Sequence, residues 1–144
     1  MRIHTIGFTR KPARTFFGLL RESGARRLID VRLHNMSQLA GFTKRDDLEY
    51  FLAELCGMAY IHELRLAPIK PMLDAYQKRG GPWEEYERSF LDLMAERRVE
   101  QTLSREVLDN SVLLCSEPTA EHCHRRLVAE YLAERWDDVE IAHL

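Results

Sequence analysis

The densest group of chemically capable side chains lies in residues 115–126, which read Cys-Ser-Glu-Pro-Thr-Ala-Glu-His-Cys-His-Arg-Arg. A cysteine attacks an electrophile as its thiolate, and positive charge or a helix N-terminus lowers the thiol pKa from about 8.5. We expect Cys115 to be a nucleophile or redox-active thiol and Glu117 to be the acid or base beside it. The ligand-binding candidates in the same segment are Cys123, His124 and Arg125, the last as an anion clamp.

Further candidates follow the other predicted strands. Asp30 and Arg32 come at the end of an apolar run, and we expect Asp30 to act with the catalytic thiol and Arg32 to bind an anion. The structural alternative is that these two residues simply pair with each other and fix the loop that follows. The remaining ligand-binding candidates are Gly7, Thr9 and Tyr60, each close to the end of a predicted strand.

Five strands are predicted, at residues 2–6, 28–31, 58–62, 112–115 and 139–141. Helices are expected between them. One follows Pro12 and stops at Gly24, and another begins with a capping pair of Thr43 and Asp46. Three more are expected near 72–78, 83–94 and 99–107. Thr119 is expected to be the N-cap of the last helix, which would place Cys123 inside that helix.

The alternation of strands and helices predicts an α/β fold in which residues 1–144 form a single domain. We expect three layers around a mostly parallel sheet of about five strands, in a Rossmann-like or flavodoxin-like topology. The helices between the third and fourth strands would be a helical insertion. Ligands bind such open sheets at the carboxyl ends of the strands, so the candidate residues should gather at one edge, with the first and fourth strands central.

Known thiol and metal arrangements do not match the spacing of the cysteine segment. A cysteine phosphatase or rhodanese loop has a short backbone cradle between the thiol and the helix that follows. Here the first arginine after Cys115 is Arg125, ten residues on, so the loop is too long for that arrangement. The seven residues between Cys115 and Cys123 exceed the two to four typical of structural zinc sites, so no metal site is predicted. Residues 5–9 hold a single glycine, which disfavours a bound dinucleotide. No cofactor is predicted.

Composition limits the class of partner. The chain has no apolar run long enough to span a membrane and no export signal, and its three cysteines are an odd number, so we expect a cytoplasmic protein with reduced thiols. The expected ligand is a small anion or a nucleotide. Residues 1–45 hold ten Lys and Arg against two acids, which keeps a nucleic-acid binding module with structural thiols as an alternative. Its phosphate contacts would come from Arg10, Lys11, Arg14, Arg26, Arg27, Lys44 and Arg45.

Three blocks give the chain a family resemblance. Thr-Ile-Gly-Phe-Thr at 5–9, Leu-Ile-Asp-Val-Arg at 28–32, and Leu-Cys-Ser-Glu at 114–117 with Cys-His-Arg at 123–125 resemble the signature blocks of the domain-of-unknown-function 488 family. The resemblance implies a small α/β domain whose site lies at the Cys, Glu and Cys-His-Arg block, and it implies no known reaction. A metal-binding or redox-sensing protein using Cys115, Cys123 and His124 therefore remains a third possibility.

Overall fold

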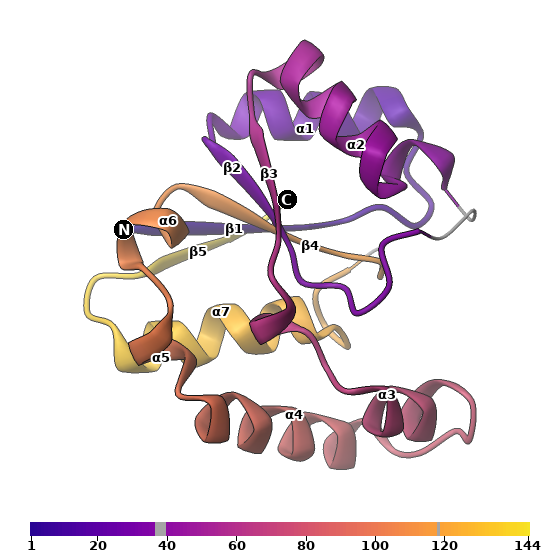
Figure 1. Ribbon diagram of the computed structural model, residues 1–144, viewed down its shortest axis with the longest axis vertical. Coiled ribbons are helices and arrows are strands. Elements are labelled where there is room, and N and C mark those ends of the chain that lie inside the picture. The colour runs from indigo at the N-terminus through magenta and orange to yellow at the C-terminus, as the bar shows by residue number, and fades with distance from the viewer. Residues whose placement is uncertain (37–39, 118) are drawn as a thin grey trace.

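The sheet has five strands, all parallel, in the order β3-β2-β4-β1-β5 (Figure 1). The computed structural model describes residues 1–36, 40–117 and 119–144. The strand bounds differ from the predicted ones by at most two residues. They are β1 (Arg2–Gly7), β2 (Arg27–Asp30), β3 (Ala59–His62), β4 (Ser111–Cys115) and β5 (Glu140–His143).

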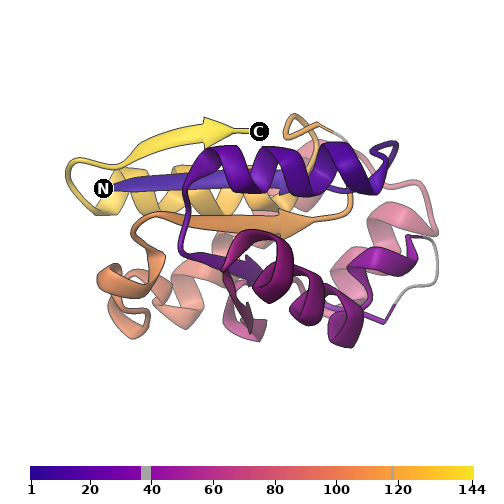
Figure 2. The same cartoon turned by 90° about the horizontal axis from the view of Figure 1, so that it is seen from above.

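Helices cover both faces of the sheet, which confirms the predicted α/β fold in three layers. One face carries α1 and α2, and the other carries α7 with α4 packed against its outer side (Figure 1). Seen from above, α1 lies along the direction of the strands (Figure 2). The helices are α1 (Ala13–Ser23), α2 (Arg45–Phe51), α3 (Lys70–Gln77), α4 (Trp83–Arg97), α5 (Val99–Thr102), α6 (Arg105–Leu108) and α7 (His124–Arg135).

Shorter helical turns complete the connections. A 3-10 turn, η1 (Gly41–Thr43), precedes α2, a π-helical turn, η2 (Leu52–Cys56), extends it, and a second 3-10 turn, η3 (Leu64–Leu66), follows β3. The segment between β3 and β4 contains α3, α4, α5 and α6, as the predicted helical insertion requires. The connections before β3 run over one face, and those after it run over the other (Figure 1).

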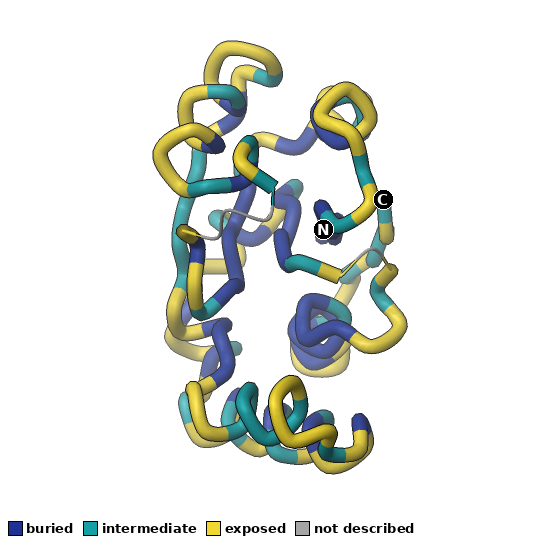
Figure 3. Tube along the Cα trace, turned by 90° about the vertical axis from the view of Figure 1, so that its right-hand side faces the viewer, coloured by how far each residue is buried: buried dark blue, intermediate teal, exposed yellow. Residues whose placement is uncertain are grey.

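The central strand β4 divides the apolar core in two. Successive side chains of a strand point to opposite faces. Val112 and Leu114 pack against α1 and α2, whereas Leu113 and Cys115 pack against α7 and α4. Every residue of β4 is buried, and the buried trace lies inside exposed outer faces (Figure 3). A strand that is buried along its whole length requires cover on both faces, which explains why it occupies the middle of the sheet.

Two predicted helix starts are wrong. The helix after β4 begins at His124 with Cys123 as its N-cap, and not at Thr119. Residues 119, 121 and 122 are exposed, so a helix over them would bury almost no apolar surface and gain little from forming. The helix before β3 starts after Lys44, because the Thr43 hydroxyl donates to the Ala40 carbonyl instead of capping the helix.

Candidate functional site

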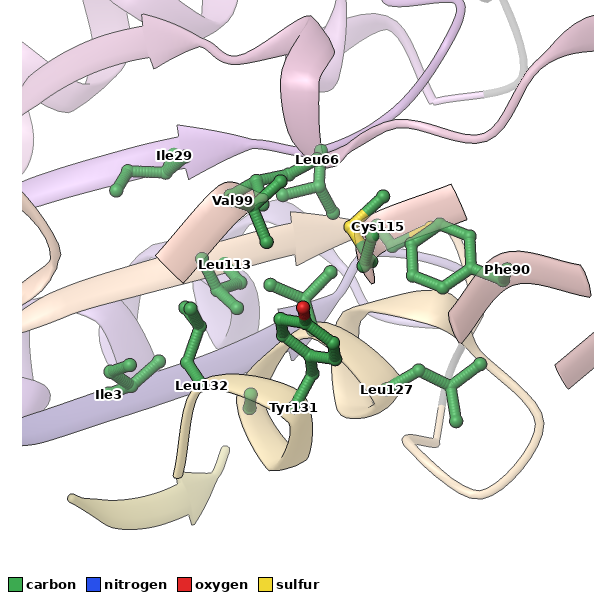
Figure 4. Close-up of a cluster of buried hydrophobic side chains, with 14 of the residues drawn as sticks. Ile3, Ile29, Leu66, Phe90, Val99, Leu113, Cys115, Leu127, Tyr131 and Leu132 are labelled. Carbon is green, nitrogen blue, oxygen red and sulfur yellow. The ribbon is translucent and has the colours of Figure 1, made fainter. Parts of the chain in front are cut away.

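Cys115 is the last residue of β4, where it pairs with Gly7 of β1. Its side chain lies at the carboxyl end of the strand beside Leu66 and Phe90 (Figure 4). Only 5% of the residue is exposed, and that part opens on a pocket of about 240 Å³. The Cys115 thiol is therefore sheltered by the core but reachable from the pocket.

The imidazole of His124 is held against Cys115 by a backbone carbonyl. Its Nε2 atom lies 2.7 Å from the carbonyl oxygen of Val31, the residue that follows β2. Because a carbonyl can only accept, Nε2 carries the proton of the neutral ring and Nδ1 is left as an acceptor. Nδ1 lies 3.5 Å from the Cys115 Sγ. The arrangement is a thiol, a base and a group that orients the base, as in enzymes with a cysteine nucleophile.

Cys123 completes a buried cluster with these two residues. The two sulfur atoms and a ring nitrogen of His124 all lie within 4.8 Å of one another. The Cys123 thiol lowers the pKa of Cys115 through a hydrogen bond to its sulfur, against the opposing effect of burial, and the Ser116 N–H and Arg125 lower it further. Burial raises the pKa of Cys123 well above its ordinary value. Cys115 is accordingly the thiol that ionises first.

Arg125 supplies positive charge from behind the loop that follows β4. The residue is 1% exposed, and its Nη1 donates to the Glu117 carbonyl at 2.8 Å. Its Nε has no acceptor within the described residues, and none of the ion pairs among those residues includes Arg125. Gly7 makes this approach possible, since a Cβ there would overlap the Glu117 carbonyl and lie 2.8 Å from the Arg125 Nη1. A buried arginine without a carboxylate favours an anion nearby, and the Cys115 thiolate is one.

Asp30 is occupied by structural partners. Its carboxylate accepts from the Nε and Nη2 atoms of Arg32 at 2.9 and 2.8 Å, and from the Tyr60 hydroxyl at 2.6 Å. Asp30 is fully buried, and the Arg32 Nη2 also donates to the Thr43 carbonyl. Burial raises the pKa of Tyr60, and Asp30 raises it further, so the phenol stays a donor. The pairing that stood as the structural alternative for Asp30 and Arg32 is thus what the fold contains.

Arg32 nevertheless reaches the pocket. It lines the pocket beside Phe8, with its guanidinium carbon 5.4 Å from the centre of the Phe8 ring. Its Nη1 is buried and has no hydrogen-bond partner in the described part of the chain. One edge of the guanidinium is therefore fixed by Asp30, and the remaining nitrogen is a donor without an acceptor.

The opposite wall of the pocket is aromatic and comes from the helical insertion. Trp83 stacks on His122 with ring centres 5.0 Å apart, and Tyr76 and Tyr86 extend the wall. The Tyr86 hydroxyl is buried and makes no hydrogen bond to any described residue. Burial raises the pKa of Tyr86, which keeps the hydroxyl protonated and able to donate. The wall thus combines flat apolar surfaces with an unused donor.

The structure separates the predicted residues into two groups. Those that line the pocket are Arg32, Cys115, Glu117, Cys123 and His124. The Glu117 side chain is exposed and raises the pKa of Tyr76 by its charge, after the larger effect of burial. The residues that support the pocket from behind are Gly7, Thr9, Asp30, Tyr60 and Arg125; the Thr9 N–H, for example, donates to the Ser116 carbonyl.

Sequence reasoning missed the aromatic wall. The sequence predicts only a helix near 83–94, and nothing in the spacing of Trp83 and Tyr86 shows which element they will face. The available signal was the length of the insertion, because a long insertion at the end of a parallel strand is placed where ligands bind. One polar residue behind Arg32 was also missed: the Asn35 amide donates to the Tyr60 hydroxyl. His62, at the end of β3, bonds the Arg32 carbonyl through its Nε2.

Three residues could hold a metal ion. The Cys115, Cys123 and His124 ligand atoms lie close enough to share one, and all three residues are buried. The 3.5 Å between the Cys115 Sγ and the His124 Nδ1 is near the edge of a tetrahedron with Zn–S of about 2.3 Å and Zn–N of about 2.1 Å. Spacing along the chain disfavoured a metal, but the fold brings the two cysteines and His124 together.

Fold and site define a small α/β protein with a sheltered thiol and imidazole at the carboxyl edge of a parallel sheet. The sequence model of the family described as domain of unknown function DUF488 matches residues 12–132. The chain belongs to the DUF488 family, as the three blocks of residues predicted. Searches of curated proteins and of solved structures return no significant match. Within the described residues, no helix is long and apolar enough to cross a membrane.

Proposed function

We propose that this protein is a thiol-dependent enzyme in which Cys115 attacks a small anionic ligand bound in the pocket. The observation that carries the proposal is the pairing of the Cys115 Sγ with the His124 Nδ1 at the floor of that pocket. We further propose that it acts in the reducing cytoplasm as a single domain, where its free thiols would stay reduced.

The reaction would begin with proton transfer from the Cys115 thiol to the His124 Nδ1. The thiolate would attack the electrophilic atom of the ligand, forming a bond to sulfur, and the leaving group would depart with the proton held by the imidazolium. Water would then hydrolyse the covalent intermediate and restore the thiol. The Ser116 N–H and Arg125 would stabilise the thiolate, and Glu117 remains a second candidate acid or base at the pocket rim.

The pocket supports a flat ligand that carries acceptor atoms. Arg32 and Tyr86 line the pocket and each has a buried donor without a partner in the described residues, and Trp83 and Phe8 provide flat apolar surface. A small aryl or heteroaryl anion, including a nucleotide-like ligand, would place its ring against the aromatic wall and its charge at Arg32.

Alkylation rates test the role of Cys115. In a Cys56→Ser chain, the anionic reagent iodoacetate is expected to modify Cys115 faster than the neutral iodoacetamide does, after correction for the ratio of the two rates on free cysteine. Phenyl phosphate is expected to slow both reagents by occupying the pocket. Equal corrected rates together with no protection by phenyl phosphate would contradict an anion-accepting thiol site.

A metal centre is the second candidate function, and the cluster of Cys115, Cys123 and His124 is the observation that favours it. Metal-bound histidines usually donate their other ring N–H to a carbonyl or carboxylate, and the His124 Nε2 is hydrogen-bonded to the Val31 carbonyl in this way. Metal analysis of protein purified without an affinity tag tests this function. About one equivalent of zinc, lost in a Cys123→Ala chain but kept in a Cys56→Ser chain, would favour the metal centre over the nucleophile.

The nucleic-acid alternative is supported less well. Arg26 and Arg27 lie at the amino end of β2, whereas Arg10 and Lys11 follow the carboxyl end of β1. Because all strands are parallel, these two pairs lie toward opposite ends of the sheet and do not form one continuous basic surface. Tight binding to duplex DNA at about 150 mM salt would restore this alternative.

A further inference from the structure

Two of the three cysteines share the floor of the pocket. Cys115 ends β4 and Cys123 is the N-cap of α7, and both line the pocket with 5% and 2% of their surfaces exposed. Their sulfur atoms lie within 4.8 Å of each other. The third cysteine, Cys56, belongs to the core on the other face of the sheet, where its thiol donates to the Phe17 carbonyl. The chain therefore contains one thiol pair and one separate thiol.

We propose that Cys115 and Cys123 are a reversible modification site that forms a disulfide when a hydroperoxide enters the pocket. This inference goes beyond the proposed function, because it needs both thiols and a peroxide and does not depend on what ligand the enzyme binds. It also gives Cys123 a chemical role of its own, as the thiol that resolves oxidised Cys115.

The chemistry balances with the hydroperoxide as the only oxidant. The Cys115 sulfur attacks one peroxide oxygen, the O–O bond breaks, and an alcohol or water leaves, so that Cys115 becomes a sulfenic acid. The Cys123 sulfur then attacks the Cys115 sulfur, an S–S bond forms, the S–O bond breaks, and water leaves with the proton of Cys123. Two thiols lose two electrons, and one hydroperoxide gains them.

The positions of the two cysteines allow this closure. A disulfide has an S–S length of about 2.05 Å, so the sulfurs must approach by roughly 3 Å at most, which a change of side-chain rotamer can largely provide. Cys115 is fixed in the central strand. Cys123 comes before the first helical turn of α7 and directly follows the exposed turn residues 121 and 122, so it is the side of the pair that can move.

The test uses the full chain carrying Cys56→Ser, treated with a chelator and then with hydrogen peroxide. After the reaction, remaining thiols are labelled with N-ethylmaleimide in denaturant and the intact mass is measured. We expect a mass decrease of about 2 Da, the loss of both labels together, and full recovery with dithiothreitol. Cys115 and Cys123 share the tryptic peptide 106–125, so cleavage after Glu121 is needed to show the cross-link.

A matched variant separates disulfide formation from simple oxidation. In the Cys56→Ser, Cys123→Ser chain, Cys115 is expected to accumulate the sulfenic and sulfinic forms, with mass increases of about 16 and 32 Da. The proposal is overturned if the chain that keeps Cys123 gains the same oxygen additions, if it forms only intermolecular dimers, or if both thiols remain fully labelled. None of these outcomes depends on finding the ligand of the proposed enzyme.

Discussion

The Nδ1 atom of His124 lies 3.5 Å from the Sγ of Cys115, and the other nitrogen of the ring is bonded to the Val31 carbonyl. These contacts join three elements, because Cys115 ends β4, Val31 follows β2 and His124 begins α7. The hydrogen bond to the Val31 carbonyl at the end of β2 consequently fixes the direction in which the Nδ1 lone pair of His124 points. A shift of β2 relative to β4 would turn the imidazole away from the sulfur.

The pH dependence of alkylation should distinguish Cys115 from Cys56. The Cys123 thiol lowers the pKa of Cys115 below its ordinary value, and burial raises the pKa of Cys56. Since the thiolate is the reactive form, the ratio of Cys115 to Cys56 labelling by iodoacetamide should increase as the pH falls below 9. Peptide mass spectrometry measures the ratio. A ratio that stays constant from pH 6 to pH 9 would contradict the lowered Cys115 pKa.

Removal of the Cys123 thiol should make Cys115 less reactive. The hydrogen bond from Cys123 is the largest cause of the lowered Cys115 pKa, so Cys123→Ala should raise that pKa and slow alkylation near neutral pH. Cys56 in the same molecule is the internal reference, because it lies on the other face of the sheet. An unchanged labelling ratio at pH 7 would show that the Ser116 N–H and Arg125 lower the Cys115 pKa without help from Cys123.

Gly7→Ala should destabilise the protein strongly. A methyl group at position 7 would overlap the Glu117 carbonyl, which is backbone and cannot rotate away. We expect a loss of about 2–4 kcal/mol in the free energy of unfolding, measured by urea denaturation. The matched control is Gly18→Ala in α1, where nothing lies within 4 Å of the added carbon and stability should rise by about 0.5–1 kcal/mol. Equal effects of the two substitutions would contradict the close approach at Gly7.

Asp30→Asn should act on stability, because the variant leaves the Arg32 guanidinium buried without its counterion. Breaking a buried ion pair from one side costs about 3–5 kcal/mol, which urea denaturation should detect. Asp74→Asn removes an exposed pair with Lys70 and should change stability little. If Asp30→Asn kept full stability and lost only ligand binding, the structural role that we assign to Asp30 would be wrong.

Tyr86→Phe should leave the unliganded protein as stable as before or slightly more so. Its hydroxyl has no hydrogen-bond partner in the described residues, so removal gives up no bond and relieves a buried polar group. The same change should weaken protection of Cys115 by phenyl phosphate, since it removes one of the two free donors of the pocket. Thermal unfolding and the alkylation assay give the two readouts, and a loss of about 1 kcal/mol or more would indicate a missed structural bond.

The apolar pattern of the sequence was enough to predict the sheet. The run of residues 112–115 predicted a central buried strand, and the helical stripes predicted the layers, because burial of apolar side chains determines both. The start of α7 could not be predicted from Thr119, since a capping residue without an apolar face behind it does not nucleate a helix. The type of a single residue such as Thr119 therefore predicted the helix start less well than the pattern of apolar residues predicted the sheet and its layers.

The candidate site was predictable only in part, for a related reason. The topology rule placed Cys115 and Arg32 at one edge, but it could not reveal that Tyr60 and the Thr43 carbonyl also bind the Asp30–Arg32 pair. These partners are distant in sequence, and only tertiary packing brings them together. Spacing along the chain therefore cannot determine which of the predicted polar residues face the pocket and which support it.

The position of the helical insertion has a consequence for how such a protein can change. The thiol, the imidazole and the buried arginine come from the sheet and from α7, whereas the aromatic wall comes from α3 and α4, within residues 70–97. Under the proposed function, the reactive thiol and imidazole and most of the aromatic wall would therefore be encoded in separate stretches of the gene. Substitutions confined to the insertion could therefore change which ligand the pocket binds. The thiol, the imidazole and the buried arginine would stay unchanged.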